Sequence, residues 1–377
     1  MDSSKSSQPQ AGAGRKSWGR RLLGCSLGVA GIALLSAAFL VWYFWQPPNL
    51  VCTAVIDAHA RNANGKSSIL GLAFSPDCTQ LASGASDGMA KVWDPIAKTE
   101  RRTFLHQKET VTTLAFSPDG RTLAVGDRNC LITLWDTETW TPRLAWPADY
   151  DTKFPMVRRV LYSPDGRLIA SYGVTTVTIW DAKTGKERIR CAAGAGRYLQ
   201  SAALSPDGRQ VAACYRNGVV YVLDTDTGTE RAALTYPYER FIRHVAFSPD
   251  GKTVVASICP YTFDLTAWGR VVVWDLASGQ VVSDVAVGRT MYVDLIAYSP
   301  DGKLLACSGG KLFEDAQGDW ATYLLDATNW RVLAQAKADG VSSSPEAIAF
   351  SPDGNQLVTS HLDGALRFWD VTPWRNR

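Results

Sequence analysis

The stretch that decides the fold is Val-Thr-Thr-Leu-Ala-Phe-Ser-Pro-Asp-Gly, residues 111–120. Its first six residues carry apolar side chains at roughly every second position, which is typical of a half-buried strand. Its last four residues suit a type I turn, because Pro fixes φ at the second position and Gly tolerates a positive φ. A second apolar run follows, and then a third that ends in Trp135-Asp136. The stretch therefore predicts one small antiparallel sheet.

The same unit recurs seven times along the chain. Gly follows Ser-Pro-Asp in six copies, and Cys78 follows it in the first. Trp precedes the closing aspartate in five copies, and Leu223 and Leu325 replace it in the fourth and sixth. The serines are Ser75, Ser117, Ser163, Ser205, Ser248, Ser299 and Ser351. The closing pairs with Trp are Trp93-Asp94, Trp135-Asp136, Trp180-Asp181, Trp274-Asp275 and Trp369-Asp370, and the other two copies end at Asp224 and Asp326.

Each copy needs neighbours to be stable. Asp87-Gly88, Asn217-Gly218 and Asp363-Gly364 are hairpin signals between the second and third runs. A single small sheet cannot bury both of its faces, whereas sheets arranged radially bury them against each other. The sequence therefore predicts an all-β ring.

At these residues, over roughly 50–370, the sequence resembles the WD-repeat family of β-propellers. The resemblance implies seven blades of four antiparallel strands. It also implies a structural hydrogen-bond set of His, Ser or Thr, Trp and Asp in each blade, which is expected here only in fragments, with no copy holding all four. The fragments are His106 with Trp135; Ser83 with Asp87 and Trp93; and Thr359 with Asp363 and Trp369.

The last copy ends soon after Asp370, so its fourth strand has to come from elsewhere. Residues 50–57 form an unassigned strand before the first copy. We expect this strand to complete the seventh blade and close the ring, because a free sheet edge is unfavourable.

Composition is that of an ordinary folded protein, with 20% charged and 46% hydrophobic residues and a net charge of +3. Residues 1–21 hold five basic residues against Asp2, which is +4, so the rest of the chain sums to 3 − 4 = −1. The folded part therefore lacks the basic excess that nucleic-acid binding requires, and no nucleic-acid partner is expected.

Residues 22–45 form a run without a charged residue, long enough as a helix to cross a ~30 Å hydrocarbon core. It ends in four aromatic residues before Pro47-Pro48, and basic residues precede it, which predicts a cytoplasmic N-terminus and an extracytoplasmic propeller. The alternative is a cleaved signal peptide, whose apolar core is normally shorter. Gly24 and Gly28 could support weak helix pairing, and the propeller itself is expected to be monomeric. The expected organisation is a disordered basic tail (1–21), a transmembrane helix (22–45), a linker (46–49) and the propeller (50–377).

No catalytic or metal-binding pattern stands out. The seven cysteines beyond the apolar run are scattered, without a CxxC pair, and the four histidines lack ligand spacing. His106 lies where the resemblance places the structural His, and His244 lies inside an expected strand, where a satisfied core residue is the simpler interpretation. No nucleophile elbow, Walker loop or zinc-protease motif is present. We therefore expect no catalytic residue, no metal and no cofactor.

Departures from the repeat indicate where a partner could bind. From Ser to the closing Asp, five copies take 18 or 19 residues, but the fifth and sixth take 27, with insertions between the second and third strands. The resemblance implies that these loops and the blade-to-blade connections share one face. Aromatic and arginine side chains, which dominate many interfaces, gather there; the alternative is that the rings only pack the loops. The candidates are Tyr150, Phe154, Tyr236, Tyr238, Arg240, Tyr261, Phe263, Trp268, Phe313 and Trp320.

The sequence thus favours a membrane-anchored, non-catalytic propeller that scaffolds protein partners at the extracytoplasmic face. The alternative is a sensor or enzyme that binds a small ligand in the central channel. Convergent His, Asp or Arg side chains in that channel, with shifted pKa values, would favour the alternative.

Overall fold

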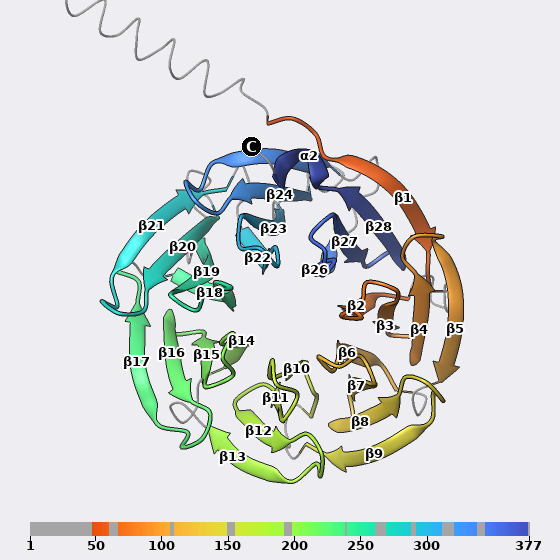
Figure 1. Cartoon of the computed structure of the whole chain (residues 1–377). Coiled ribbons are helices and arrows are strands. Elements are labelled where there is room, and N and C mark those ends of the chain that lie inside the picture. Colours follow the sequence, from red (N-terminus) through yellow and green to blue (C-terminus); the bar gives the residue numbers. More distant parts are fainter. Residues whose placement is uncertain are drawn as a thin grey trace, which may run out of the picture. The chain divides into compact units, whose positions relative to one another are not determined.

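A computed structural model describes residues 47–59, 67–105, 109–148, 155–191, 198–237, 240–260, 269–287, 292–310, 320–337 and 344–375. Pro48 to Arg377 form one compact unit. Within the described residues, the strands form seven four-stranded antiparallel sheets. Figure 1 shows these sheets as the blades of a ring, with the first strand of each blade at the centre and the last at the rim. The all-β, seven-bladed propeller expected from the repeats is confirmed.

The first three blades are consecutive hairpins. Blade 1 holds β2 (Ile69–Phe74), β3 (Leu81–Ala85), β4 (Met89–Asp94) and β5 (Thr99–Leu105); blade 2 holds β6 (Val111–Phe116), β7 (Thr122–Asp127), β8 (Leu131–Asp136) and β9 (Pro142–Pro147); blade 3 holds β10 (Arg159–Tyr162), β11 (Leu168–Tyr172), β12 (Val177–Asp181) and β13 (Glu187–Cys191).

The next three blades follow the same order. Blade 4 holds β14 (Leu199–Leu204), β15 (Gln210–Tyr215), β16 (Val219–Asp224) and β17 (Glu230–Thr235); blade 5 holds β18 (Arg240–Phe247), β19 (Thr253–Pro260), β20 (Arg270–Asp275) and β21 (Val281–Ala286); blade 6 holds β22 (Tyr292–Tyr298), β23 (Leu304–Gly310), β24 (Ala321–Asp326) and β25 (Val332–Lys337).

Blade 7 is built from both ends of this unit. It holds β26 (Pro345–Phe350), β27 (Gln356–His361), β28 (Ala365–Asp370) and, as its outer strand, β1 (Val51–Asp57). β1 pairs antiparallel with β28, from Val51 opposite Asp370 to Asp57 opposite Ala365. Residues 50–57 thus lie where the sequence analysis placed them. The short helix α2 (Thr372–Arg375) follows β28 and buries Trp374.

The Ser-Pro-Asp turn has the same hydrogen bonds in every blade. In blade 2 the Ser117 hydroxyl donates to Asp119 at 2.6 Å and accepts from the backbone N–H of Thr122 at 2.9 Å. The donated bond is the main reason that the pKa of the Asp119 carboxyl lies below its usual value. Gly120 adopts φ of 71°, and in blade 1 Cys78 adopts the corresponding φ of 61°, where a side chain is strained.

The core lies between the blades. Buried apolar residues form a cluster at each junction, and one example joins Trp93 and Leu81 of blade 1 to Phe368 and Leu366 of blade 7. The corresponding clusters join blades 1 and 2, 2 and 3, 3 and 4, 4 and 5, 5 and 6, and 6 and 7. Each blade is therefore stabilised by its neighbours, as the repeat physics requires.

The N-terminal predictions concern residues 1–46, which lie outside the described residues. Within the described part of the chain, no helix has the length and apolar character needed to cross a membrane.

Candidate functional site

The innermost strand of most blades contains a bulge, and the residues at these bulges lie at the centre of the propeller. In blade 4, for example, Leu199 pairs with Tyr215 and Ser201 with Cys214, so that Gln200 is an extra residue. Such a bulge leaves one residue out of the ladder and redirects its side chain. The equivalent residue is always the fifth before the Ser of the turn. Six blades have this bulge, at Leu70, Thr112, Gln200, Arg243, Asp294 and Glu346. In blade 3 the equivalent sequence position is Arg158, which immediately precedes β10, and the pairing of β10 itself shows no shift. We call these seven residues the bulge ring.

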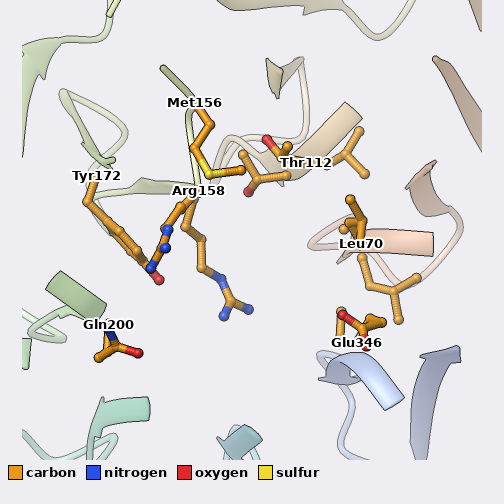
Figure 2. A pocket seen from close by; sticks show the side chains of 13 residues that line it. Leu70, Thr112, Met156, Arg158, Tyr172, Gln200 and Glu346 are labelled. Carbon is orange, nitrogen blue, oxygen red and sulfur yellow. The ribbon is translucent and has the colours of Figure 1, made fainter. Parts of the chain in front are cut away.

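A cavity of about 330 Å³ lies at the bulge ring. Five members of the ring line it, together with side chains such as Met156, Arg159 and Tyr172. Figure 2 shows Met156, Arg158 and Tyr172 on one side of this space and Leu70 and Glu346 across from them. We call this space the central cavity. Its volume falls at the lower end of the range usual for small-molecule pockets.

Two adjacent arginines on blade 3 face inward. The guanidinium of Arg158 donates to the carbonyl oxygen of Leu199 at 3.0 Å. The guanidinium of Arg159 donates to Nε2 of His244 on blade 5 at 2.8 Å. Both contacts are with uncharged acceptors, so the positive charge of the pair is not neutralised by them.

His244 is held as a neutral imidazole. Burial, followed by the charge of Arg159, lowers its pKa to about 3. Because Nε2 accepts the bond from Arg159, the proton lies on Nδ1, and this buried atom has no hydrogen-bond partner among the described residues. The backbone N–H of His244 donates to the Ser257 hydroxyl at 3.0 Å. The sequence predicted a core histidine with satisfied hydrogen bonds, and this holds for Nε2 of the imidazole but not for Nδ1.

The other charged members of the ring lie on blades 5 to 7. Arg243 Nε lies 3.5 Å from Asp294 Oδ1, and the Arg243 guanidinium lies 5.9 Å from the centre of the Tyr292 ring. Burial raises the pKa of the Asp294 carboxyl, and the charge of Arg243 only partly offsets it. Burial also raises the pKa of Glu346, and the nearby Asp294 acts in the same direction. The centre of the propeller thus brings together arginines, two carboxyl groups whose pKa is raised and a histidine whose pKa is lowered.

Most of the predicted partner-binding residues lie outside the described residues. These are Tyr150, Phe154, Tyr238, Tyr261, Phe263, Trp268 and Phe313. Arg240 begins β18, and its backbone pairs with Pro260.

Two of the predicted aromatic residues are described, and both make packing contacts. Trp320 is half-buried with its ring 5.4 Å from that of Tyr292, edge to face. A Cβ at Gly310 would lie 2.8 Å from the Trp320 ring, so this close approach needs a glycine. The Tyr236 hydroxyl donates to Asp284 at 2.8 Å.

Blade 1 corrects one expectation, that no copy holds the complete structural set. His59 Nε2 and Trp93 Nε1 both bond the Ser83 hydroxyl, at 2.9 and 2.8 Å, and His59 Nδ1 lies 2.9 Å from Asp87 Oδ2. The four residues form one connected buried network. Burial opposes ionisation of Asp87, but the interactions with His59, the backbone N–H of Met89 and the charge of Lys91 together outweigh it, so the pKa of Asp87 lies below the usual value. His59 was missed because it lies sixteen residues before Ser75, whereas His106 lies eleven before Ser117.

Other blades keep parts of this network. Trp180 donates to the Ser171 hydroxyl at 2.6 Å, and Trp369 donates to the Thr359 hydroxyl at 3.0 Å. In blade 7 the imidazole bonded to Thr359 comes from His361, within the same strand, at 2.9 Å. His106 lies outside the described residues. The closing aspartates accept backbone N–H groups of the following turn, as Asp94 does from Ile96 and Ala97.

Within the described residues, no group of three or more His, Cys, Asp or Glu side chains could hold a metal ion. Cys78, Cys191, Cys214, Cys259 and Cys307 are free thiols. Burial raises the pKa of Cys214 and Cys259 to about 12, so these two behave as small apolar residues.

The repeats are recognised independently of the structure. The family model described as "WD domain, G-beta repeat" matches residues 50–94, 98–136 and 339–370. These intervals contain β1 and the strands of blades 1 and 7, with most of blade 2. The chain therefore carries WD40 repeats within a seven-bladed β-propeller, a class that typically serves as a scaffold for protein interactions.

Two characterised proteins are similar over part of the chain. Periodic tryptophan protein 2 of Saccharomyces cerevisiae is 26% identical over 106 residues, which is 28% of this chain and 10% of the yeast protein. Small ribosomal subunit protein RACK1y of Oryza sativa subsp. japonica is 33% identical over 106 residues, which is 28% of each chain. The matches thus span a tenth and somewhat over a quarter of these relatives.

Proposed function

We propose that this chain is a membrane-anchored propeller that holds protein partners at the extracytoplasmic face and carries out no catalysis. The scaffold role is the general role of WD40 propellers, and the comparisons support the repeats that define that class. The anchor and its orientation rest on the uncharged run at residues 22–45 and on the basic residues before it.

The observation that supports the protein-binding role is the pair of enlarged connections in neighbouring blades. They join β19 to β20 and β23 to β24, and the other blades connect the same two strands with a short turn. Residues at their bases pack together: Cys259 of β19 and Tyr292 of β22 form a buried cluster, against which Phe241 of β18 and Trp320, just before β24, are packed. A rigid base beneath long loops is the arrangement that binding loops generally use.

Replacing both connections tests this role. Residues 261–268 and 311–319 would each be exchanged for Asn-Gly, the turn already used in blade 4 at Asn217-Gly218. Proximity labelling from the full anchored chain should then lose specific partners while the midpoint of thermal unfolding stays close to that of the wild type. The double variant Tyr261→Ala, Trp268→Ala is the finer comparison, and it leaves out Trp320 because that ring packs on Tyr292. If it loses stability together with labelling, these rings serve packing and the contact assignment is wrong.

A reporter fused after Arg377 tests the orientation. A reporter that is active only outside the cytoplasm should give signal, because the basic residues before the apolar run keep the N-terminus inside. A signal from a cytoplasmic reporter at the same position would contradict the anchor model.

A second candidate function is the binding of a small ligand in the central cavity. The observation that favours it is the convergence of Arg158, Arg159, Gln200 and Glu346 on one space, with a neutral His244 behind it. A scaffold that only presents loops has no need of such groups at its centre.

A further inference from the structure

The two arginines of the central cavity differ from the arginines on the outer strands in whether they pair with a carboxylate. Arginines on the outer strands generally pair with a carboxylate: Arg101 with Asp94, Arg188 with Asp181 and Arg231 with Asp224. Arg158 and Arg159 form no such pair with any described residue, and their recorded hydrogen bonds go to a carbonyl and to an imidazole. A guanidinium has five N–H donors, so each keeps donors for a ligand.

The surroundings strengthen this positive site. His244 is uncharged at pH values above its low pKa. Its hydrogen bond therefore orients the Arg159 guanidinium without changing the net charge of the site. The amide of Gln200 and the hydroxyl of Tyr172 also line the cavity, and the Tyr172 hydroxyl lies 3.5 Å from that of Ser201. Two guanidiniums with an amide and a phenol beside them supply the paired N–H and O–H donors that a carboxylate or a phosphate accepts.

Glu346 defines the far end. It lies across the cavity from Arg158 (Figure 2). Burial raises the pKa of Glu346 by more than its hydrogen bond with Ser344 lowers it, so the charged form is poorly stabilised. A further donor from a ligand would stabilise it. A second anionic group at the opposite end of the ligand would meet Glu346 and be repelled. The space between the two ends is bordered by Leu70, Leu72 and Met156.

We propose that the central cavity binds a small organic anion with a single anionic group, a carboxylate or phosphate that contacts Arg158 and Arg159, and that the other end of the ligand donates a hydrogen bond to Glu346. The volume of about 330 Å³ accommodates a hydroxy acid or a sugar phosphate, not a macromolecule. This inference rests on the second candidate function and is independent of protein capture by the loops.

Calorimetric titration of the purified full chain in mild detergent tests the proposal, with glycerate, glycerol phosphate and succinate as the probes. We expect glycerate or glycerol phosphate to bind with millimolar or better affinity, and succinate to bind more weakly. Arg158→Gln should weaken binding about tenfold or more, the effect of ~1.4 kcal/mol, because it removes a charge-assisted contact. Arg167→Gln, an exposed arginine beside the turn of the same blade, is the matched control and should bind as the wild type does.

Glu346→Gln provides a second, independent readout. It should reduce the preference for glycerate over succinate, because the repelling carboxylate is gone. The proposal is overturned if no probe binds at millimolar concentration, or if Arg158→Gln binds as tightly as the wild type. A glutamate-containing peptide serves as a further probe. If this peptide binds through Arg158 and the small anions do not bind, the cavity takes an acidic side chain of a partner protein, and the proposal of a small ligand is overturned. Partner labelling by the loop variants is measured separately. A failure of protein binding by the loops can therefore be distinguished from a failure of ligand binding in the central cavity.

Discussion

The two ends of the innermost strands differ in how far they repeat. At one end, the Ser-Pro-Asp turn has the same donor and acceptor atoms in all seven blades, with Ser–Asp distances of 2.5–2.6 Å. At the other end, five residues earlier, the bulge ring holds two arginines, two acids, an amide, a hydroxyl and a leucine. The first end carries the contacts that build a blade, and the second end carries the chemistry that a ligand would meet.

This comparison predicts that stability resides in the repeated contacts and in the closure of the ring, and that the bulge ring is nearly neutral for stability. Four experiments test that division, and the β1 deletion is expected to have the largest effect.

Deleting residues 51–57 from the full chain should lower the free energy of unfolding by several kcal/mol, on the order of 3–6, because β28 loses its partner and the apolar contacts of β1. Urea unfolding followed by tryptophan fluorescence measures the loss. Val55→Thr is the control, since this side chain is 58% exposed and its replacement should change stability by less than about 0.5 kcal/mol. An unchanged midpoint after the deletion would show that the ring does not depend on this strand.

Ser83→Ala should cost about 2–3 kcal/mol, because it removes the shared partner of His59 and Trp93 inside a buried network. Thermal unfolding gives the measurement. Ser278→Ala, which removes a hydroxyl from an exposed turn, should cost less than about 1 kcal/mol. Equal losses in the two variants would mean that the blade 1 network contributes no more than a surface contact.

The direct comparison uses two residues of blade 3. Ser163→Ala removes the turn bonds to Asp165 and to the Leu168 N–H and should cost about 1–2 kcal/mol. Arg158→Gln should change stability by less than about 0.5 kcal/mol. Chemical denaturation of both variants in the same buffer decides the point. A larger loss for Arg158→Gln would place the bulge ring among the stabilising contacts and erase the distinction between the two ends.

The smallest expected effect is a pH dependence from His244. Its pKa is lowered to about 3 by burial and by Arg159, so below the ordinary value of 6.5 the unfolded chain binds a proton that the folded chain does not. This histidine therefore reduces stability as pH falls from 6.5 toward 3, by up to about 1.4 kcal/mol per pH unit. His244→Gln should lose about 1 kcal/mol less than the wild type between pH 6 and pH 5. Parallel pH curves for the two proteins would contradict a neutral buried imidazole.

The fold was accessible from the sequence because its signals are local and repeated. The turn residues, the alternating runs and the hairpin signals each concern a few neighbouring positions, and seven copies in the same order reinforce one another. The insertions in the fifth and sixth copies were also visible as extra length between two recognised strands. The structure describes few of the aromatic residues predicted on these loops, so their role as contacts stays a prediction.

The residues that the sequence did not reveal act over long distances. His59 is 24 residues from Ser83, and Arg159 is 85 residues from His244. A signal for the bulge ring was present, since charged residues at the fifth position before Ser interrupt otherwise apolar strands. It becomes meaningful only once that position is known to face the centre of the ring.

The sequence by itself thus determined the blade, the number of blades and the origin of the closing strand, because hydrogen-bonded turns and strand periodicity depend on adjacent residues. Only the tertiary structure decided which side chains meet at the centre. Radial packing brings the equivalent position of all seven blades to one place, and the meeting of Arg158, Gln200 and Glu346 there depends on that geometry and not on their spacing along the chain.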